Sequence, residues 1–365
     1  MKMFSLLTVA AFATLATGAG AQENLLNSTR TIDTTDGLRI NGELIADAEL
    51  LAQAQAEGTI ALYTGVSEVV EARYAEQFKE DTGINIEVLR LVPSRLAERI
   101  LSEHGAGKLG ADVIRTSESE LVNAMADAGV FTPYQVPFED TLFADAKASP
   151  ESLFYLWTST AYSIGYNTAI IPEAEAPGSW QDLLDPKYKG KIGIVQSGAG
   201  GSTAALSRFM FDELGEDWLR GYAAQDARIF DSSARLVDAV ARGELIAGPM
   251  PPSRVDAVAL TGAPLTFILP EEGMPVWPFY MGLPESAQNV NAAKLFINWT
   301  LSKYGQELIV TLGDYAVRPD AGAPLLLGKQ LPPLDEVYKV SVEDLLTHQS
   351  NDQKTWNEIF GYTPQ

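Results

Sequence analysis

The stretch TIALYTGVSEVVEARYAEQFKEDTGINIEV, residues 59–88, decides the fold. It opens with a short apolar run typical of a buried strand. Apolar residues at 70, 74 and 78 then recur at helical spacing, and Gly83 is expected to end that helix. In residues 84–88 apolar and polar residues alternate, as in a second strand. Strand, helix and strand in this order predict a βαβ unit of a parallel sheet.

The same alternation continues along the chain. ADVI at 111–114 is a further short strand, and after residue 155 the pattern restarts with AYSIGYN, KIGIV and ELIAG, the last at 244–248. A chain of 365 residues exceeds one small core. The pattern therefore predicts an α/β protein with two compact lobes.

The composition limits the possible functions. The formal net charge is −22, which argues against non-specific binding to nucleic acid, because that requires clustered Lys and Arg. The chain has no cysteine, so disulfides and thiolate metal sites are excluded.

The N-terminus resembles an export signal. Lys2 precedes an apolar run that ends in small residues, and Ala19 and Ala21 fit a cleavage pattern. Residues 1–21 are therefore expected to be a signal peptide, and the mature chain is expected in a periplasm. The polar segment 22–56 is interpreted as a linker or loosely packed arm.

A glycine-rich loop, QSGAGGST at 196–203, follows the strand KIGIV and precedes a helical run. Glycines let backbone approach a ligand, and free N–H groups at a helix start favour an anion. The loop lacks the lysine of a nucleotide-binding P-loop, and a turn capped by Ser202 explains it equally well. The residues of this candidate anion site are Ser197, Gly198, Ala199, Gly200, Ser202 and Thr203.

Other candidates follow from the rule that ligands bind at the carboxyl ends of strands in open α/β sheets. Two groups follow predicted strands of the first lobe: Tyr63, Thr64, Gly65 and Ser67, then Arg115, Thr116 and Ser117. Arg115 could recognise phosphate or carboxylate. Ser232 and Arg254 could line the second lobe, and Trp277 and Tyr280 could stack on the ligand. Core packing or surface exposure is the alternative for each.

Sequence patterns of enzymes are missing. The two histidines, His104 and His348, stand far apart, and no H-E-x-x-H or G-x-S-x-G motif occurs. We expect a binding protein that needs no cofactor and no metal, with a secreted hydrolase as the rival class.

Several segments resemble, in consistent order from about residue 57 to 320, the extracellular solute-binding proteins of ABC importers. The most specific are SWQDLLDPKYKGKIG at 179–193 and YNTAII at 166–171, joined by YAVRPD at 315–320. The branch includes ferric-ion-binding, thiamine-binding and sugar-phosphate-binding members. The resemblance implies a type II periplasmic-binding-protein fold, in which hinged lobes with mixed central sheets and flanking helices close on a ligand.

Position by position, the residues that bind iron in the ferric members are replaced here. Ser67, Ser117 (with Glu118 beside it), Pro251 and Pro252 stand at those positions, whereas Ser197-Gly198-Ala199 matches the loop that holds an anion. The resemblance therefore implies a small anionic organic ligand: phosphorylated, phosphonate or carboxylate. Ferric iron with an anion, or a cation such as thiamine or a polyamine bound near Glu68 or Glu118 and Trp277, are the alternatives.

The resemblance also implies partners and boundaries. A monomer would deliver its solute to a membrane permease with a cytoplasmic ATPase. Lobe 1 is expected at 57–160 plus 266–308 and lobe 2 at 161–265 plus 309–365. The chain should cross between them near Thr160–Asn167 and return near Leu265–Gly273.

Overall fold

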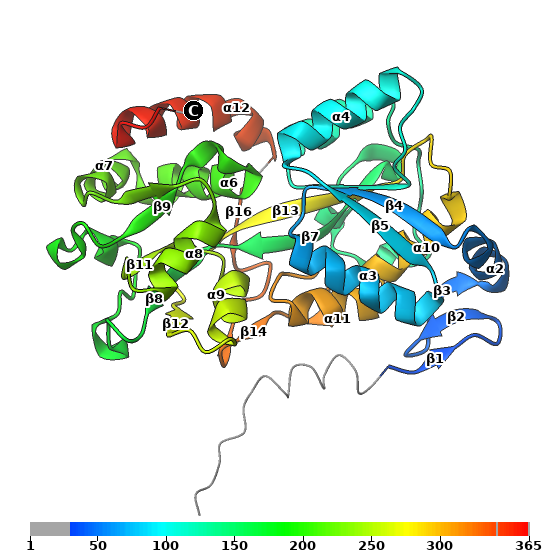
Figure 1. Cartoon of the computed structure of the whole chain (residues 1–365), viewed down its shortest axis with the longest axis horizontal. Coiled ribbons are helices and arrows are strands. Elements are labelled where there is room, and N and C mark those ends of the chain that lie inside the picture. Colours follow the sequence, from blue (N-terminus) through cyan, green and yellow to red (C-terminus); the bar gives the residue numbers. More distant parts are fainter. Residues whose placement is uncertain (1–29, 341, 364–365) are drawn as a thin grey trace, which may run out of the picture.

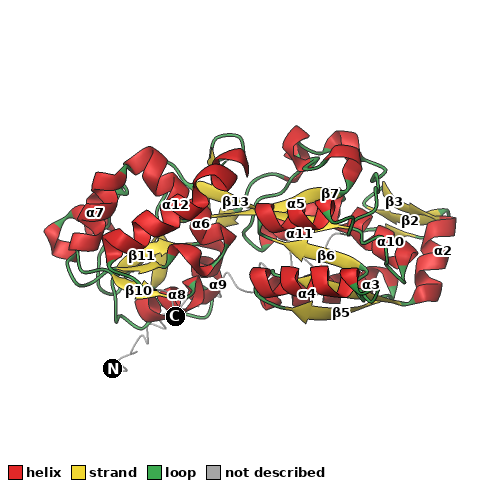
Figure 2. Cartoon of the chain, turned by 90° about the horizontal axis from the view of Figure 1, so that it is seen from above, coloured by secondary structure: helices red, strands yellow, loops and turns green. Residues whose placement is uncertain are grey.

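The computed structural model describes residues 30–340 and 342–363 and shows two lobes side by side (Figures 1 and 2). The predicted signal peptide lies outside the described residues.

Lobe 1 is built on the predicted βαβ units. Strands β4 (Thr59–Thr64), β5 (Asn85–Arg90) and β6 (Val113–Thr116) are parallel, with β4 in the middle. Helices α3 (Glu68–Thr82), α4 (Pro93–Gly105) and α5 (Ser119–Asp127) connect or follow them. α4 and α5 cover one face of the sheet, and α3 packs on the other with α10 (Val290–Leu301) and α11 (Lys303–Thr311).

The N-terminal segment differs from the loosely packed arm that the sequence suggested. Strands β1 (Ile32–Asp33), β2 (Gly37–Ile40) and β3 (Glu43–Asp47) form a small antiparallel sheet, and α2 (Ala48–Glu57) packs on α10. Leu38, Ile40 and Ile45 are buried in the core of lobe 1.

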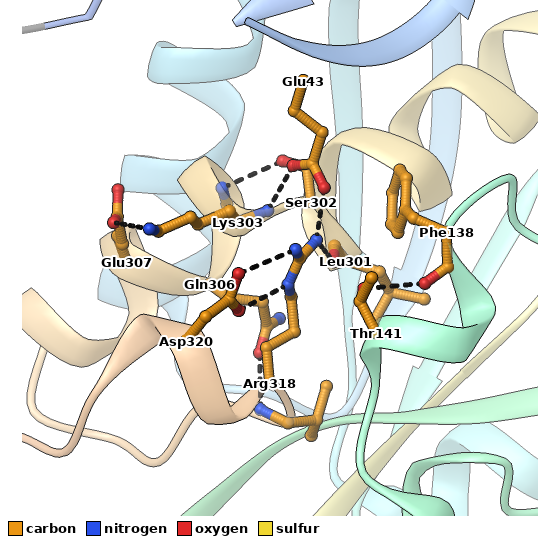
Figure 3. Close-up of polar contacts among 12 residues, drawn as sticks. Glu43, Phe138, Thr141, Leu301, Ser302, Lys303, Gln306, Glu307, Arg318 and Asp320 are labelled. Atoms are coloured by element: carbon orange, nitrogen blue, oxygen red, sulfur yellow. Dashed lines mark hydrogen bonds and ion pairs between the residues drawn. The ribbon is translucent and has the colours of Figure 1, made fainter. Parts of the chain in front are cut away.

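Polar contacts fix this segment to the rest of lobe 1 (Figure 3). Oε1 of Glu43 accepts a hydrogen bond of 2.6 Å from buried Arg318, which also pairs with Asp320, and Oε2 accepts one of 2.7 Å from the backbone of Lys303. The prediction failed because the strands of this sheet, with 2, 4 and 5 residues, are too short to show a clear alternation of apolar and polar residues.

Lobe 2 also has a mixed sheet. β8 (Ser163–Asn167) lies between β11 (Ala247–Met250) and β12 (Leu265–Phe267), antiparallel to both, and β9 (Gly193–Val195) pairs in parallel with β10 (Arg228–Phe230). A single parallel bridge from Ile192 to Ala247 joins the two parts. Its helices are α6 (Gly201–Phe209), α7 (Glu216–Ala224), α8 (Ser233–Ala241) and α9 (Pro252–Ala259).

Two long antiparallel strands, β7 (Phe154–Ala161) and β13 (Pro275–Gly282), pass between the lobes (Figure 1). The crossing strands therefore overlap the predicted segment Thr160–Asn167 only at Thr160 and Ala161, and β13 begins just after Leu265–Gly273. Thr160–Asn167 and Leu265–Gly273 mostly belong to lobe 2, because Leu265 and Asn167 already pair within its sheet.

The C-terminal part touches both lobes. Ile309, Ala316 and Val317 pack in the core of lobe 1, although the sequence suggested lobe 2 from residue 309. After β14 (Leu325–Leu326) and β15 (Lys329–Gln330), β16 (Tyr338–Lys339) pairs with β13. The last helix, α12 (Val342–Phe360), lies on α6 and α7 of lobe 2 (Figure 1).

Candidate functional site

The lobes meet at the start of α6. A Cβ atom added to Gly201 would lie 2.4 Å from the ring of Trp277 and 2.6 Å from the carbonyl oxygen of Ser117. Ser117 follows β6 of lobe 1, and Trp277 lies on β13. Glycine at this position therefore allows the two lobes to touch.

The carboxylate of Glu118 lies at this junction. It faces the backbone N–H of Gly201, so a side chain of lobe 1 reaches the N-terminus of a helix in lobe 2. Burial between the lobes raises the pKa of Glu118 to about 7, the Gly201 N–H opposes that rise, and the charge of Glu120 adds to it. The first N–H groups of an α-helix have no intrahelical acceptor and attract anions.

Trp277 adds an unused donor. Its side chain is 2 % exposed, and its indole N–H has no hydrogen-bond partner among the described residues. The ring edge that carries this N–H lies against Gly201. Buried indole N–H groups usually find an acceptor, so this N–H is a donor left unsatisfied beside the N-terminus of α6.

A second polar cluster adjoins the first through Ser202. The hydroxyl of Ser202 lies 3.4 Å from that of Tyr162, which Ser233 and the charge of Arg254 also face. Arg254 lies in the first turn of α9 and is partly exposed.

Asp314 completes this second cluster. Burial raises its pKa to about 6, while the hydroxyls of Thr160 and Ser253 and the charge of Arg254 oppose the rise. One of its carboxylate oxygens is buried without a hydrogen-bond partner among the described residues.

Arg115 is not a ligand residue, which corrects the sequence prediction. It is fully buried in lobe 1, where it donates hydrogen bonds of 2.7 Å to Glu71 and to Thr300, and its guanidinium lies 4.0 Å from the ring centre of Trp157. The alternation of side chains along β6 points Arg115 into the face that α3 and α10 cover.

The predicted site residues at the end of β4 fall into two groups, one buried and one partly exposed. Thr64 is buried and donates to Glu71 at 2.7 Å, and Tyr63 packs in the core between the sheet and α4, so neither is available to a ligand. Gly65 and Ser67 are partly exposed, and the Ser67 side chain makes no cap hydrogen bond to α3. Thr116 is 1 % exposed.

Only part of the glycine-rich loop reaches the junction. Ser197 is buried, and Gly198 packs so closely on Gln353 of α12 that a Cβ would lie 2.0 Å from its amide nitrogen. The Thr203 hydroxyl is used inside the loop, by Ser197 and Gly200. Ser197, Gly198, Ala199 and Thr203 thus shape the turn, while Gly200 and Ser202 lie beside Glu118 and Tyr162 respectively.

Two further predicted residues have other roles. Ser232 caps α8 by accepting a hydrogen bond from Arg235 N–H at 3.4 Å. Tyr280 packs with Phe154, bonds to Ser119 at 2.7 Å and lines a separate cavity of about 410 Å³ beside β7 and β13.

The sequence analysis did not select Gly201, Tyr162 or Asp314, and it named Glu118 only for a metal or cation. Gly201 could have been found as the first residue of the predicted helix. Nothing in the sequence places Tyr162 beside Ser202, or Asp314 beside Thr160 and Arg254. Within the described ranges, no three His, Cys, Asp or Glu side chains gather to form a possible metal site, and no helix is long and apolar enough to span a membrane.

Two hinged α/β lobes with polar groups where they meet define a type II periplasmic binding protein. Residues 110–338 match the family model described as bacterial extracellular solute-binding protein, and the chain belongs to that family. Families of this kind bind and do not catalyse, and the chain is the solute-binding component of an ABC importer.

Relatives in this family bind chemically diverse solutes. The chain is 23 % identical to the Fe(3+)-binding periplasmic protein of Serratia marcescens over 77 % of this chain and 86 % of the relative. It is 25 % identical to a putative 2-aminoethylphosphonate-binding periplasmic protein of Salmonella typhimurium, over 84 % and 90 %. The solved structure of the periplasmic binding protein AfuA from Actinobacillus pleuropneumoniae, with fructose-6-phosphate bound, has a TM-score of 0.69 at 19 % identity, covering 84 % of this chain and 99 % of that one.

Proposed function

We propose that this protein captures a small organic anion (phosphorylated, phosphonate or carboxylate) where its lobes meet. The observation that carries the proposal is the position of the Glu118 carboxyl group, which faces the Gly201 N–H at the N-terminus of α6, where a helix attracts an anion. Gly201 N–H, Ser202 and the orphan N–H of Trp277 are the donors, and Arg254 supplies a nearby positive charge.

Transport would follow from closure. The proposed donors come from lobe 2 and from the hinge strand β13, so an anion held by both favours the conformation in which the lobes touch. A permease with a cytoplasmic ATPase would recognise that conformation. An export signal at residues 1–21 and a periplasmic location belong to the same proposal.

One observation favours a second candidate, a cationic or amine-bearing solute. Glu118 and Trp277 both adjoin Gly201, and the neighbouring cluster with Arg254 contains the carboxylate of Asp314. A carboxylate facing an aromatic ring is a common arrangement for binding organic cations.

A ligand screen distinguishes the two candidates. The mature chain, stripped of carried ligand by partial unfolding and dialysis, is tested by thermal shift with sugar phosphates, phosphonates, carboxylates, thiamine, spermidine and ferric citrate. A ligand at a hundred times its Kd adds about 2.7 kcal/mol of stability. We expect stabilisation by anions. Stabilisation by thiamine or spermidine alone, lost in Glu118→Gln, would favour the second candidate.

Two substitutions test the donors. Trp277→Phe keeps the ring but removes the N–H, and Ser202→Ala removes the hydroxyl. Each should weaken anion binding about tenfold to a hundredfold, since a hydrogen bond to a charged group contributes about 1.5–3 kcal/mol. Ser232→Ala, a matched change at the cap of α8, should leave affinity unchanged. Equal affinity in all four proteins would contradict this placement of the anion.

A further inference from the structure

The side chain of Glu118 does not cap the helix that it precedes. It occupies the N-cap position of α5, yet its side chain makes no cap hydrogen bond there. The carboxylate instead extends to the N-terminus of α6, and Oε1 lies 4.0 Å from the position of a Cβ on Gly200. It therefore stands where the proposed ligand would place its anionic group.

The junction has little to offset two negative charges. The backbone of Gly201, the indole ring of Trp277 and the carbonyl of Ser117 meet there in close contact. The partial charge at a helix N-terminus is about half a unit, and at this partly buried place water screens a second negative charge less than it does in bulk solvent. A bound anion and an ionised Glu118 would therefore oppose each other.

We propose that Glu118 makes anion capture proton-coupled: as the anion binds at α6, the Glu118 carboxylate takes up one proton from solvent. The neutral carboxyl group then donates its O–H to the anion in place of repelling it. This inference rests on the proposed anion site and adds that the site binds an anion only together with a proton on Glu118.

The surroundings of Glu118 support this coupling. The ionisable group that acts on it from its own helix is Glu120, which raises its pKa further, while α6 and β13 present Gly201 N–H and Trp277, neither of which titrates. Arg254 and Asp314 belong to the neighbouring cluster around Tyr162. With a pKa of about 7, Glu118 changes charge between pH 6 and 8, so anion affinity should rise as the pH falls through this range.

The test uses sulfate, whose own charge does not change between pH 5 and 9. Calorimetry in buffers of different ionisation enthalpy counts the protons taken up per sulfate. At pH 8 the wild-type protein should take up nearly one proton, and its affinity should be roughly tenfold lower than at pH 6.5. Glu118→Gln should take up none, bind with the same affinity at both values, and bind more tightly than wild type at pH 8.

Glu120→Gln is the matched control, because it removes an exposed carboxylate two residues away and should keep the proton uptake. Small-angle scattering of the ligand-free protein gives a second readout: the radius of gyration should grow from pH 6 to pH 8.5 in wild type but not in Glu118→Gln. Sulfate binding without proton uptake, equal in both proteins, would overturn the coupling and leave the anion site standing. Absence of anion binding in every variant would overturn the proposed function together with the coupling.

Discussion

At the scale of single residues, the arginine that looked most suitable for a ligand is part of the core. Arg115 lies between the rings of Trp157 and Phe296, at 4.0 and 4.5 Å, and pairs with buried Glu71. Its guanidinium donates to Met281, Glu71 and Thr300, which water cannot reach, so it specifies how α3 and α10 pack on the sheet.

Removing this arginine should therefore destabilise the protein without a specific effect on ligand. Arg115→Ala leaves Glu71 as an unpaired buried charge and should lower the free energy of unfolding by about 3–5 kcal/mol, measured by urea denaturation. Arg235→Ala, which breaks an exposed pair with Asp231, should change it by less than about 1 kcal/mol. Similar effects of the two substitutions would mean that the buried pair is not structural.

Residue-scale prediction from sequence worked where a local pattern decides the outcome. The periodicity of 59–88 gave β4, α3 and β5 nearly to the residue. It failed for Arg115, because which face of a strand the helices cover is settled by distant segments. It also failed for Ser197 and Gly198, because the helix that covers them lies about 150 residues further along the chain.

At the scale of elements, α6 and β13 meet at one glycine. Gly201→Ala puts a methyl group where the Trp277 ring and the Ser117 carbonyl lie within 2.6 Å. Alanine is a better helix former than glycine. Any loss of stability or affinity in this variant must therefore come from the contact between the lobes.

The substitution should push the lobes apart. We expect Gly201→Ala to enlarge the radius of gyration in small-angle scattering and to weaken anion binding tenfold or more. Gly105→Ala, near the end of α4 where an added Cβ meets open space, serves as control and should behave like wild type. Wild-type scattering and affinity in Gly201→Ala would refute a tight junction.

At the scale of the whole molecule, the junction should make stability depend on pH. The pKa of Glu118 rises from 4.5 to about 7 on folding. The folded protein therefore holds this proton more tightly than the unfolded chain, and stability falls as the pH rises from about 4.5 to 7. The pKa of Asp314 rises from 3.8 to about 6 on folding, so this group also lowers stability as the pH rises through that interval.

Urea denaturation at pH 5 and pH 7.5 measures this effect. Because Glu118 is only partly buried, we expect wild type to lose about 1–2 kcal/mol more than Glu118→Gln between these values. Asp314→Asn should remove a separate part of the loss of stability, the part that occurs between about pH 4 and 6. Parallel pH profiles for wild type and Glu118→Gln would show that the carboxyl group is not desolvated.

The position of α12 has a consequence for how the chain is made. Trp356 is 1 % exposed in lobe 2, and Asp352 holds Arg208 through two hydrogen bonds of 2.8 and 2.7 Å. The core of lobe 1 includes residues as late as Val317, and the core of lobe 2 includes Trp356. During synthesis from the N-terminus, therefore, neither lobe can complete its core until these late residues have emerged, and lobe 2 waits for α12.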